Sequence, residues 1–279
     1  MIEQIPIDTP KIQLSLCMIV KNEEKTLGSC LESVKDIVDE MIILDTGSSD
    51  NTIQIAKKFG ADIYHFKWCD DFSAARNESI KFAKGMWILW MDADEQFDKS
   101  SKEELNSIIK LSQHPMGVNI NIRNISRKNE SYGTAYRLFS NHFGIHFKNI
   151  VHEQVSYSLK EMNAEIIDSN IIIDHFGYDE VQYDQENKRQ RNLPLLQRMI
   201  DDNPNDFFPQ FLLGQHYSGD TKTQEEAIYH LEKFIDMNSN ETKLIASVMY
   251  LEFKKLTFYA SRSGYAVFFN LGGRYFIPG

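Results

Sequence analysis

Two aspartates one residue apart, Asp92 and Asp94, are the side chains most suited to chemistry in this sequence, because they follow six large apolar residues at 86–91. Such a run is typical of a buried strand, and alternation along a strand sends both carboxylates to the same face. Ligands of open α/β sheets bind at the carboxyl ends of the strands. Carboxylate oxygens there suit Mg²⁺ or Mn²⁺, which can also bind a diphosphate. The spacing therefore predicts a metal–diphosphate site, and the simpler alternative is an acidic loop after a strand.

The elements that would position these carboxylates alternate along the first 111 residues. Apolar, strand-like runs occupy 14–20, 41–44, 61–66 and 86–91, and helix-like segments occupy 26–38, 50–59, 71–84 and 99–111. Asp71 or Ser73 is expected to begin the third helix, and Ser100 and Glu103 occupy capping-box positions of the fourth. This alternation predicts a parallel sheet with helices on both faces.

From Gly117 the pattern changes, because polar and apolar residues alternate at 118–125, 135–139 and 145–155. Alternation of this kind is typical of half-exposed strands. The short apolar runs at 166–167 and 171–173 predict one more pair of strands. We expect residues 117–178 to form a mixed extension of the sheet that covers the cleft.

The remaining chain is expected to be helical and then irregular. The polar residues at 180–195 favour a solvated face, with an exposed helix as the alternative, and 192–256 partly meets the tetratricopeptide consensus. A single repeat needs about two more repeats or a neighbouring domain to bury its apolar face. The expected organisation is a polar leader at 1–12, an α/β domain at 13–180, a helical region at 181–259 and an irregular tail at 260–279.

The composition excludes several classes of function. The 279-residue chain has a net charge of −10, which makes it a poor candidate for binding nucleic acid, because neutralising phosphates requires clustered Lys and Arg. Its three cysteines, Cys17, Cys30 and Cys69, form no Cys-x-x-Cys motif, which indicates a reducing compartment without a disulfide framework. The sequence shows neither a secretory signal nor an apolar run long enough to span a membrane. We therefore expect a cytoplasmic protein without a transmembrane segment.

Four ordered segments resemble the family 2 glycosyltransferases of the GT-A fold: residues 19–24 (IVKNEE), 43–52 (ILDTGSSDNT), 71–77 (DFSAARN) and 90–95 (WMDADE). They are most similar to the bacterial subgroup with tetratricopeptide-like helices after the catalytic domain. That subgroup includes enzymes that glucosylate cysteine or serine in glycocin bacteriocin precursors. The segments 136–139, 151–155 and 174–178 are also similar to it, so that the resemblance covers 14–180 well and 192–256 loosely.

The resemblance implies an inverting glycosyltransferase with a Rossmann-like mixed sheet and a short tetratricopeptide-like helical region. The implied donor is a UDP-sugar, with UDP-glucose as the expected one. The implied acceptor is a peptide Cys or Ser or a surface glycan, and the helical region favours a peptide because repeat surfaces bind extended segments. A homodimer through the helical region is also expected.

The resemblance assigns a set of residues to the donor nucleotide: Val20, Asn22, Glu23, Asp45, Arg76, Asn77, Asp92 and Ala93. Asp45 and Glu23 can accept hydrogen bonds from uracil or ribose, and their alternatives are a turn-capping Asp and a first-turn helix Glu. Arg76 has a fork suited to phosphate or to a buried carboxylate, and a structural ion pair is its alternative. Asn77 is expected to be an orienting hydrogen-bonding residue.

The resemblance further implies that Asp94 ligates Mn²⁺ or Mg²⁺, while Asp92 contacts ribose or a metal-bound water. His175 is the candidate third ligand, and its alternative is a hydrogen-bonded structural residue. An inverting displacement needs a base on the acceptor. Glu153 is the candidate base, and His152 is expected to shape the acceptor site. The alternative for 151–155 is an ordinary alternating strand.

Two other functions share some of these features. Phosphatases of the haloacid dehalogenase type also place two such aspartates at a strand end, but there the motif follows the first strand, whereas here it follows the fourth. The second alternative is a non-catalytic tetratricopeptide-type binding module with a relic nucleotide-sugar domain. Intact Asp45, Asp92 and Asp94 count against a relic.

Overall fold

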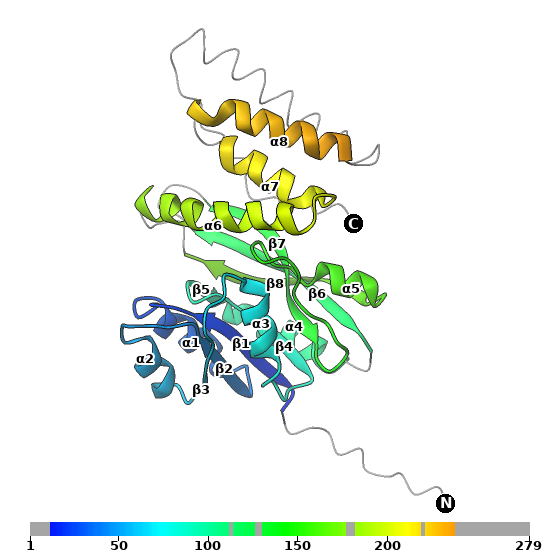
Figure 1. Cartoon of the computed structure of the whole chain (residues 1–279). Coiled ribbons are helices and arrows are strands. Elements are labelled where there is room, and N and C mark those ends of the chain that lie inside the picture. The colour runs from blue at the N-terminus through cyan, green and yellow to red at the C-terminus, as the bar shows by residue number, and fades with distance from the viewer. Residues whose placement is uncertain (1–11, 112–113, 126–129, 177–181, 219–220, 238–279) are drawn as a thin grey trace, which may run out of the picture. The chain divides into compact units, whose positions relative to one another are not determined.

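The structure, a computed structural model, describes residues 12–111, 114–125, 130–176, 182–218 and 221–237. Within these residues the strands are β1 (Leu14–Val20), β2 (Glu40–Asp45), β3 (Asp62–His65), β4 (Trp87–Trp90), β5 (Glu95–Phe97), β6 (Met116–Ile125), β7 (Glu130–Ser140) and β8 (Glu165–His175). They form one sheet with the order β3-β2-β1-β4-β7-β6-β8-β5 (Figure 1). The helices between them are α1 (Leu27–Val34), α2 (Thr52–Lys58), α3 (Phe72–Ile80), the 3₁₀ turn η1 (Lys99–Ser101), α4 (Lys102–Ile108) and α5 (Ser156–Glu161).

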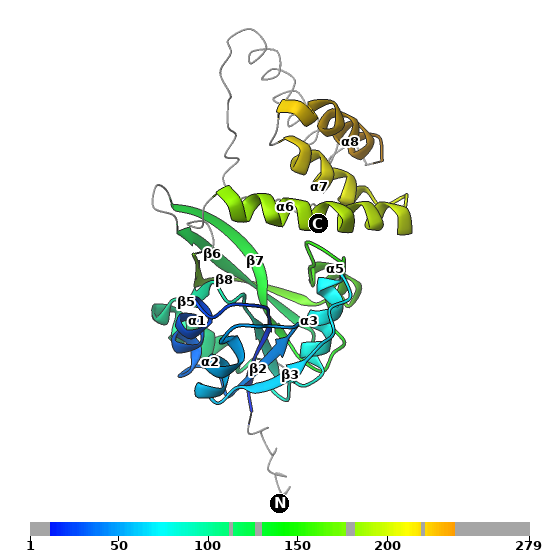
Figure 2. The same ribbon diagram turned by 60° about the vertical axis from the view of Figure 1, so that its left-hand side comes forward.

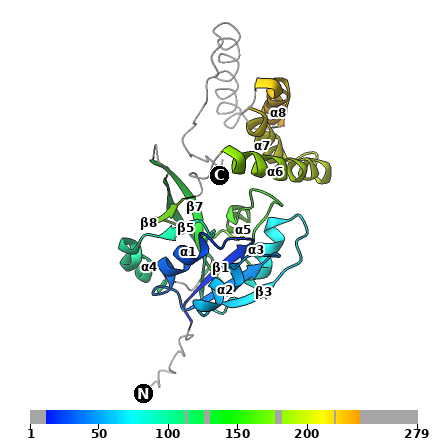
Figure 3. The same ribbon diagram turned by 90° about the vertical axis from the view of Figure 1, so that its left-hand side faces the viewer.

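The first half of the sheet is parallel, as the alternation of strands and helices predicts. β1 pairs in parallel with β2 and β4, and β2 pairs in parallel with β3. Leu16 and Met18 of β1 pack into the core that α1, α2 and α4 cover, whereas Cys17 packs into the core on the side of α3 and α5. Figure 3 shows α1 and α4 on one side of the sheet and α3 and α5 on the other. The predicted α/β arrangement with helices on both faces is confirmed.

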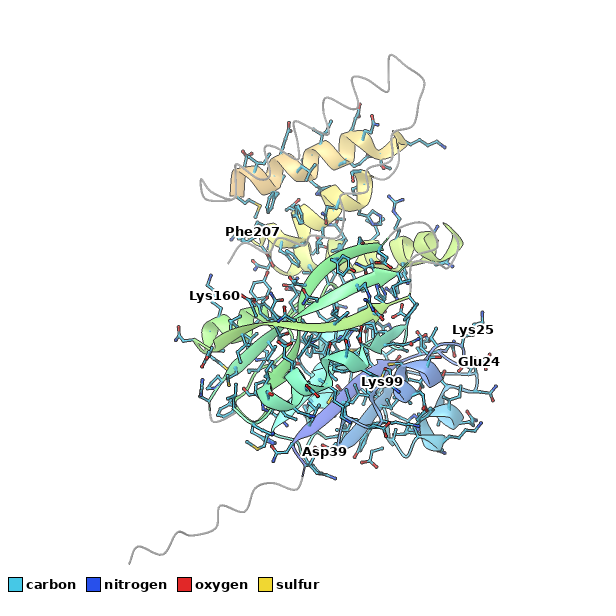
Figure 4. All side chains as sticks on the ribbon, turned by 180° about the vertical axis from the view of Figure 1, so that it is seen from behind. Glu24, Lys25, Asp39, Lys99, Lys160 and Phe207 are labelled. Carbon is cyan, nitrogen blue, oxygen red and sulfur yellow. The ribbon has the colours of Figure 1, made fainter. Side chains whose placement is uncertain are left out.

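The start of β1 is fixed by polar contacts to its two neighbouring strands. The carboxylate of Asp39, which is labelled in Figure 4, accepts the backbone N–H of Leu14 at 2.9 Å. The hydroxyl of Ser15 donates to Glu40 Oε1 at 2.6 Å and accepts the N–H of Gly85 at 2.8 Å. These bonds hold the register of β1 against β2 on one side and against the turn before β4 on the other.

The second half of the sheet is mixed, as expected for 117–178. β7 pairs antiparallel with β4 and with β6, and β6 pairs in parallel with β8. Figure 2 shows β6, β7 and β8 extending the sheet away from α1 and α2. β5 lies antiparallel to the end of β8, and the sequence did not predict this three-residue strand.

Two strand predictions in this half are wrong. Residues 145–155 form a loop with an isolated bridge between Lys148 and Gln154, and α5 follows it. Asn149 and His152 have φ values of 75° and 55°, which lie in the left-handed region and interrupt a strand. The runs at 166–167 and 171–173 belong to the single long strand β8 rather than to a pair.

Helix starts and ends differ from the prediction in instructive ways. Asp71 caps α3 as predicted, since its carboxylate accepts the N–H three residues later at 2.9 Å, but the helix ends at Ile80 rather than at 84. The predicted capping box of Ser100 and Glu103 is wrong. Asp98 accepts the N–H of Ser100 at 2.9 Å instead, so that the 3₁₀ turn η1 begins before α4.

The chain divides into two compact units, Met1–Asp179 and Glu180–Gly279. The described part of the second unit contains α6 (Gln182–Asp202), α7 (Phe207–Ser218), the 3₁₀ turn η2 (Thr221–Thr223) and α8 (Gln224–Met237), so that residues 182–195 belong to a helix, which was the alternative for this segment. The rings of Phe207 and Phe211 lie 5.8 and 5.1 Å from that of Phe234, which joins α7 to α8. The predictions for 1–11, 238–259 and 260–279 lie outside the described residues. In the described chain, no helix combines the length and the hydrophobicity that crossing a membrane requires.

Candidate active site

The loops that follow β1 and β2 are hydrogen-bonded to each other at the carboxyl edge of the sheet. Asn22 has a left-handed φ of 58°, and its side-chain oxygen accepts the N–H of Ser49 at 2.8 Å. The N–H of Glu23 donates to Thr52 Oγ1 at 2.7 Å, and its carboxylate accepts the hydroxyl of Thr26 at 3.0 Å. The contacts of Glu23 are those of a residue at a helix start, and its predicted bond to the donor nucleotide stays a prediction.

Asp45 at the end of β2 organises the turn that follows it. Its buried carboxylate accepts the N–H of Ser48 at 3.0 Å and lies 3.4 Å from His65 Nδ1. The carbonyl oxygen of Val20 accepts the N–H of Thr46 at 3.0 Å, so the ends of β1 and β2 are also held together. These contacts agree with the turn-capping alternative for Asp45, and they leave its predicted role toward uracil or ribose as a prediction.

The two aspartates that follow β4 do not lie on a strand. β4 ends at Trp90, and the N–H of Glu95 donates to the carbonyl of Asp92 at 3.1 Å to close a turn around the buried Ala93. The expectation that strand alternation sends both carboxylates to one face is therefore wrong. The side chains of Asp92 and Asp94 are 38% and 25% exposed, and they have different partners.

Asp92 lies at the centre of a chain of alternating charges. Arg76 donates through Nη2 to Asp92 Oδ1 at 2.7 Å and through Nε to Glu153 Oε1 at 2.6 Å. Arg137 donates through Nη2 to Glu95 Oε1 at 2.5 Å and to Asp92 Oδ2 at 3.3 Å. The structure thus brings together residues of α3, β7, the turn after β4 and the loop before α5.

The pKa values in this chain of charges follow from burial and from the two guanidinium groups. Although burial opposes ionisation, Arg76 and Arg137 hold the pKa of Asp92 well below its usual range. Burial raises the pKa of Glu95 to about 7, although Arg137 opposes this shift. Burial also disfavours the charged form of Arg76, but Asp92 and Glu153 raise its pKa further. Asp92 is therefore a charged acceptor at neutral pH, held in place by two permanent cations.

The indole of Trp90 contacts both guanidinium groups. The guanidinium carbons of Arg76 and Arg137 lie 4.3 and 3.6 Å from the centroid of its ring. The Trp90 N–H donates to the carbonyl of Tyr136 at 2.7 Å, which fixes the ring against β7. The ring therefore orients both arginines toward Asp92 by cation–π contact.

Asp94 and His175 form the second pair of the site. His175 Nε2 lies 3.2 Å from Asp94 Oδ2, and its Nδ1 lies 2.9 Å from Asn124 Oδ1. Burial lowers the pKa of His175, but the bond to Asp94 outweighs it and raises the pKa above its usual value. Among the described residues, no three Asp, Glu, His or Cys side chains are arranged to hold a metal ion, because Asp92 faces the arginines instead.

The loop before α5 carries the candidate base. The side chain of Glu153 is only 11% exposed and is held by Arg76, which places it in the same set of contacts as Asp92. His152, with its left-handed backbone, precedes it. Both ends of the Asn77 amide bond the backbone of Phe147, at 2.9 and 2.7 Å, so that Asn77 holds this loop against α3, and its predicted role toward the donor stays a prediction.

Arg137 and Glu95 belong to the site, although neither was predicted from the sequence. Each stood inside a segment that resembles the family, but a single Arg in an alternating strand and a third acid in an acidic turn give no signal of their own. Their pairing depends on the antiparallel register of β4 and β7, which places Leu89 opposite Leu138. That register is not visible in the sequence.

The model of the family described as Glycosyl transferase family 2 matches residues 15–176, which is more than half of the chain. The chain belongs to glycosyl transferase family 2. The resemblance inferred from the four ordered segments is thereby confirmed. The matched range contains every residue of the chain of alternating charges around Asp92 and of the Asp94–His175 pair.

Curated relatives of this family 2 chain cover most of it. It is 39% identical over 203 residues to a TPR repeat-containing protein of Synechococcus elongatus, covering 70% of this chain and 50% of that protein. It is 30% identical over 233 residues to the glycosyltransferase SunS of Bacillus phage SPbeta, covering 82% of this chain and 54% of SunS. The chain spans about half the length of the curated relatives it matches.

Among solved structures, S. aureus TarS residues 1–349 matches with a TM-score of 0.54 and 13% identity, covering 93% of this chain and 94% of that one. A likeness at this identity shows the fold alone. Together with the mixed sheet, it confirms the expected GT-A type of α/β fold for this member of family 2.

Proposed function

We propose that this chain transfers a hexose from a UDP-sugar to an acceptor by one inverting displacement, with help from a divalent cation. The observation that carries the proposal is the position of Arg76, which bonds Asp92 at 2.7 Å and Glu153 at 2.6 Å. The residue expected beside the donor and the residue expected to activate the acceptor are thereby held by one guanidinium. Membership of family 2 supports glycosyl transfer.

For the donor we propose residues at or after the carboxyl ends of the strands together with two residues of α3: Val20, Asn22, Glu23, Asp45, Asp92 and Ala93, with Arg76 and Asn77. TarS has been crystallised in complex with UDP and with UDP-GlcNAc, and this supports a UDP-sugar as the donor class. UDP-glucose is the donor we expect. Asp92 would contact ribose or a metal-bound water rather than ligate the ion directly, because Arg76 and Arg137 already bond its two oxygens.

The residues present fit a divalent cation at Asp94 and His175. Adjacent ligand atoms of an octahedral Mg²⁺ or Mn²⁺ site lie about 3 Å apart, since each bond is about 2.1 Å long. Asp94 Oδ2 and His175 Nε2 are 3.2 Å apart, which suits two neighbouring positions around one ion. When bound, the cation supplies neutralisation of the charge on the departing diphosphate. His175 must lose its proton to bind it, since only the neutral imidazole is a ligand.

For the transfer step we propose Glu153 as the base. Its carboxylate takes the proton of the acceptor hydroxyl or thiol as the new bond to the anomeric carbon forms. The bond from that carbon to the diphosphate breaks, so the nucleoside diphosphate leaves with the electron pair and the configuration inverts. Arg76 holds the carboxylate in one direction, and His152 would border the acceptor. We propose a peptide Cys or Ser, or a surface glycan, as the acceptor.

The first experiment is calorimetric titration of the protein with UDP in the presence of Mn²⁺, followed by a mass-spectrometric screen of nucleotide sugars for UDP release. Metal-dependent binding and release of UDP would support the proposal. A non-catalytic binding module, which the name of the Synechococcus relative favours, predicts no metal-dependent binding.

Glu153→Gln tests the base. Glutamine keeps the volume and an acceptor for Arg76 but takes no proton, so we expect UDP release from UDP-glucose to fall at least about 100-fold while UDP affinity stays the same. The exposed Glu161 of α5, replaced in the same way, is the matched control, and its variant should keep wild-type activity. Turnover of Glu153→Gln close to that of the wild type, with unchanged folding, would remove Glu153 from this role.

A further inference from the structure

Arg137 is a buried arginine on β7, and the proposed reaction gives it no part. Only 8% of the residue is exposed. Its Nη2 group contacts two acids that follow β4: Glu95, the first residue of β5, at 2.5 Å, and Asp92 at 3.3 Å. In the described part of the chain, its Nε and Nη1 atoms are buried without a hydrogen-bond partner. The guanidinium of Arg137 therefore bonds Asp92 and Glu95, the two acids on either side of the Ala93–Asp94 turn.

We infer that Arg137 and Glu95 are a pair of positioning residues that fixes the direction of the Asp92 carboxylate in the donor site. This inference rests on the proposed function, because it assumes that Asp92 faces the donor. Neither residue needs to touch the substrate for this role.

The hydrogen bonds around Asp92 form a closed cycle. Glu95 Oε1 accepts from Arg137, and Glu95 Oε2 accepts the backbone N–H of Asp92 at 2.8 Å. Arg137 returns to the same residue by donating to Asp92 Oδ2. The buried carboxylate of Glu95 thus fixes both the backbone of Asp92 and the guanidinium of Arg137, which in turn holds the side chain of Asp92.

The indole of Trp90 restricts Arg137 further. The guanidinium carbon lies 3.6 Å from the ring centroid, and the indole N–H is fixed by the carbonyl of Tyr136. A guanidinium held over a ring has its donors in one plane, so its direction toward Asp92 is set before any ligand binds. A lysine has a single flexible ammonium group and offers no such plane.

The purely structural alternative is that Arg137 only neutralises Glu95 inside the fold. Under that alternative, variants lose stability, but the folded fraction binds nucleotide as the wild type does. Under the positioning role, nucleotide affinity falls in protein that is still folded. Affinity per folded molecule therefore separates the two roles, and the melting temperature alone does not.

The experiment measures UDP affinity by calorimetry in the presence of Mn²⁺ for the full chain and its variants Glu95→Gln, Arg137→Lys, Arg137→Met and the double variant Glu95→Gln/Arg137→Met. We expect Arg137→Met and Glu95→Gln each to weaken binding at least tenfold. A glutamine side chain has only one oxygen, so it cannot serve both bonds of Glu95. Arg137→Lys should lie between Arg137→Met and the wild type. The double variant should bind no more than about threefold more weakly than Arg137→Met, because both changes act through Asp92.

Trp87→Phe is the matched control for lost stability. Trp87 is fully buried on the same strand as Trp90, and its indole donates to the carbonyl of Ile109 at 2.9 Å rather than to any residue of the site. This variant should melt at a lower temperature and bind UDP within twofold of the wild type.

Each outcome decides the inference. UDP binding by Arg137→Met and Glu95→Gln within twofold of the wild type would overturn the positioning role alone. If Arg137→Met does not fold, the nearly isosteric Glu95→Gln carries the same decision. Absence of UDP binding by the wild-type protein would overturn the proposed function and this inference with it.

Discussion

Asp92 and Asp94 are separated by one residue, but the partners of Asp92 are permanently charged and the partner of Asp94 can be neutral. Asp92 faces two arginines, which keep it ionised, whereas Asp94 faces an imidazole that can lose its proton. A divalent cation can take the place of the proton between His175 and Asp94. It cannot displace Arg76 or Arg137 from Asp92 as easily, because each of these arginines is also bonded to a second carboxylate. The difference between the partners therefore favours Asp94 for the cation and Asp92 for fixed hydrogen bonds.

Asn124→Leu tests the proposed cation site through a residue that contacts His175 but is not itself a proposed ligand. Asn124 Oδ1 lies 2.9 Å from His175 Nδ1, and a proton fixed there leaves Nε2 as the nitrogen that faces Asp94. Loss of such a partner of a ligating histidine costs about 10- to 100-fold in metal affinity. We expect Mn²⁺ affinity in the presence of UDP to fall by this factor, as followed by calorimetry.

Asn119→Leu is the control for this change. Asn119 is also on β6 and also bonds a side chain of β8, that of Asp168, at 3.1 Å. Equal losses in both variants would show that β6 is merely disturbed. Unchanged Mn²⁺ affinity in Asn124→Leu would argue against His175 as a ligand.

Residue types after strand ends made part of the site predictable. Asp92 and Asp94 were selected for their chemistry and for their place after an apolar run, and these are local properties of the sequence. Arg76 was assigned by the family resemblance and by the shape of its guanidinium. Glu95 and Arg137 were missed because their role arises from a contact between segments 42 residues apart in the chain. No local pattern encodes such a contact.

At the level of secondary structure, the elements with the strongest periodicity were predicted and the irregular ones were not. Alternation at 145–155 predicted a strand, but the side chain of Asn77 bonds both the N–H and the C=O of Phe147. The left-handed residues Asn149 and His152 follow in the same segment. Tertiary contacts therefore overrode the local pattern. β5 was not predicted because three residues are too few to show a period.

Asp98→Ala tests the start of the fourth helix. Asp98 caps η1 and also accepts from Arg123 at 3.1 Å, so we expect the free energy of unfolding at pH 7 to fall by about 1 kcal/mol. The hydrogen bonds from Ser100 and the charge of Arg123 lower the pKa of Asp98. The stabilisation is therefore present above the unfolded pKa of about 3.9 and is lost as the pH falls through the lower, folded-state pKa.

Urea unfolding of the wild type and of Asp98→Ala between pH 7 and pH 3 measures this effect. The difference between the two proteins should shrink below about pH 4. Asp62→Ala, at an exposed position of β3, is the control and should change stability by less than about 0.5 kcal/mol. A difference between wild type and Asp98→Ala that stays constant with pH would show that the charge of Asp98 does not contribute.

Gly85→Ala tests the close approach between the turn before β4 and the start of β1. A Cβ atom at Gly85 would lie 2.5 Å from Ser15 Oγ and 2.8 Å from the Ser15 nitrogen. Backbone must move to relieve this contact, so we expect a loss of about 1–3 kcal/mol in unfolding free energy. At Gly28 in α1 a Cβ meets only Ile55 at 3.7 Å, and Gly28→Ala should be neutral or stabilising by up to about 1 kcal/mol. Equal stabilities of the two variants would contradict this account.

For the whole molecule, the order of elements was predictable to the end of β4, and the sheet order beyond it was not. Four alternating strands and helices leave few parallel arrangements, because crossovers are right-handed and short. Beyond β4 the next strands across the sheet are β7, β6 and β8, an order that no local pattern in the sequence specifies. Alternation after Gly117 supplied the expectation of a mixed extension, and the family resemblance supplied the expectation of a GT-A fold.

The proposed site belongs to one of the two compact units. All residues proposed for the donor, the cation and the base lie between Val20 and His175, within the first unit, Met1–Asp179. Both hydrophobic cores that flank the sheet also consist of residues of this unit. The helices of the second unit contain an aromatic contact between α7 and α8 and none of the proposed site residues.

A fragment of residues 1–179 should therefore fold and bind UDP without the helical unit. We expect one cooperative unfolding transition, because a domain with its own core folds alone, and a UDP affinity in the presence of Mn²⁺ within about threefold of that of the full chain.

Transfer to a peptide acceptor should fall more than UDP release does if the helical unit holds that acceptor, since repeat surfaces bind extended segments. Calorimetry on both proteins, with light scattering to compare their masses in solution, also tests the expected homodimer through the helical region. A folded fragment that does not bind UDP, beside a full chain that does, would show that the second unit completes the donor site.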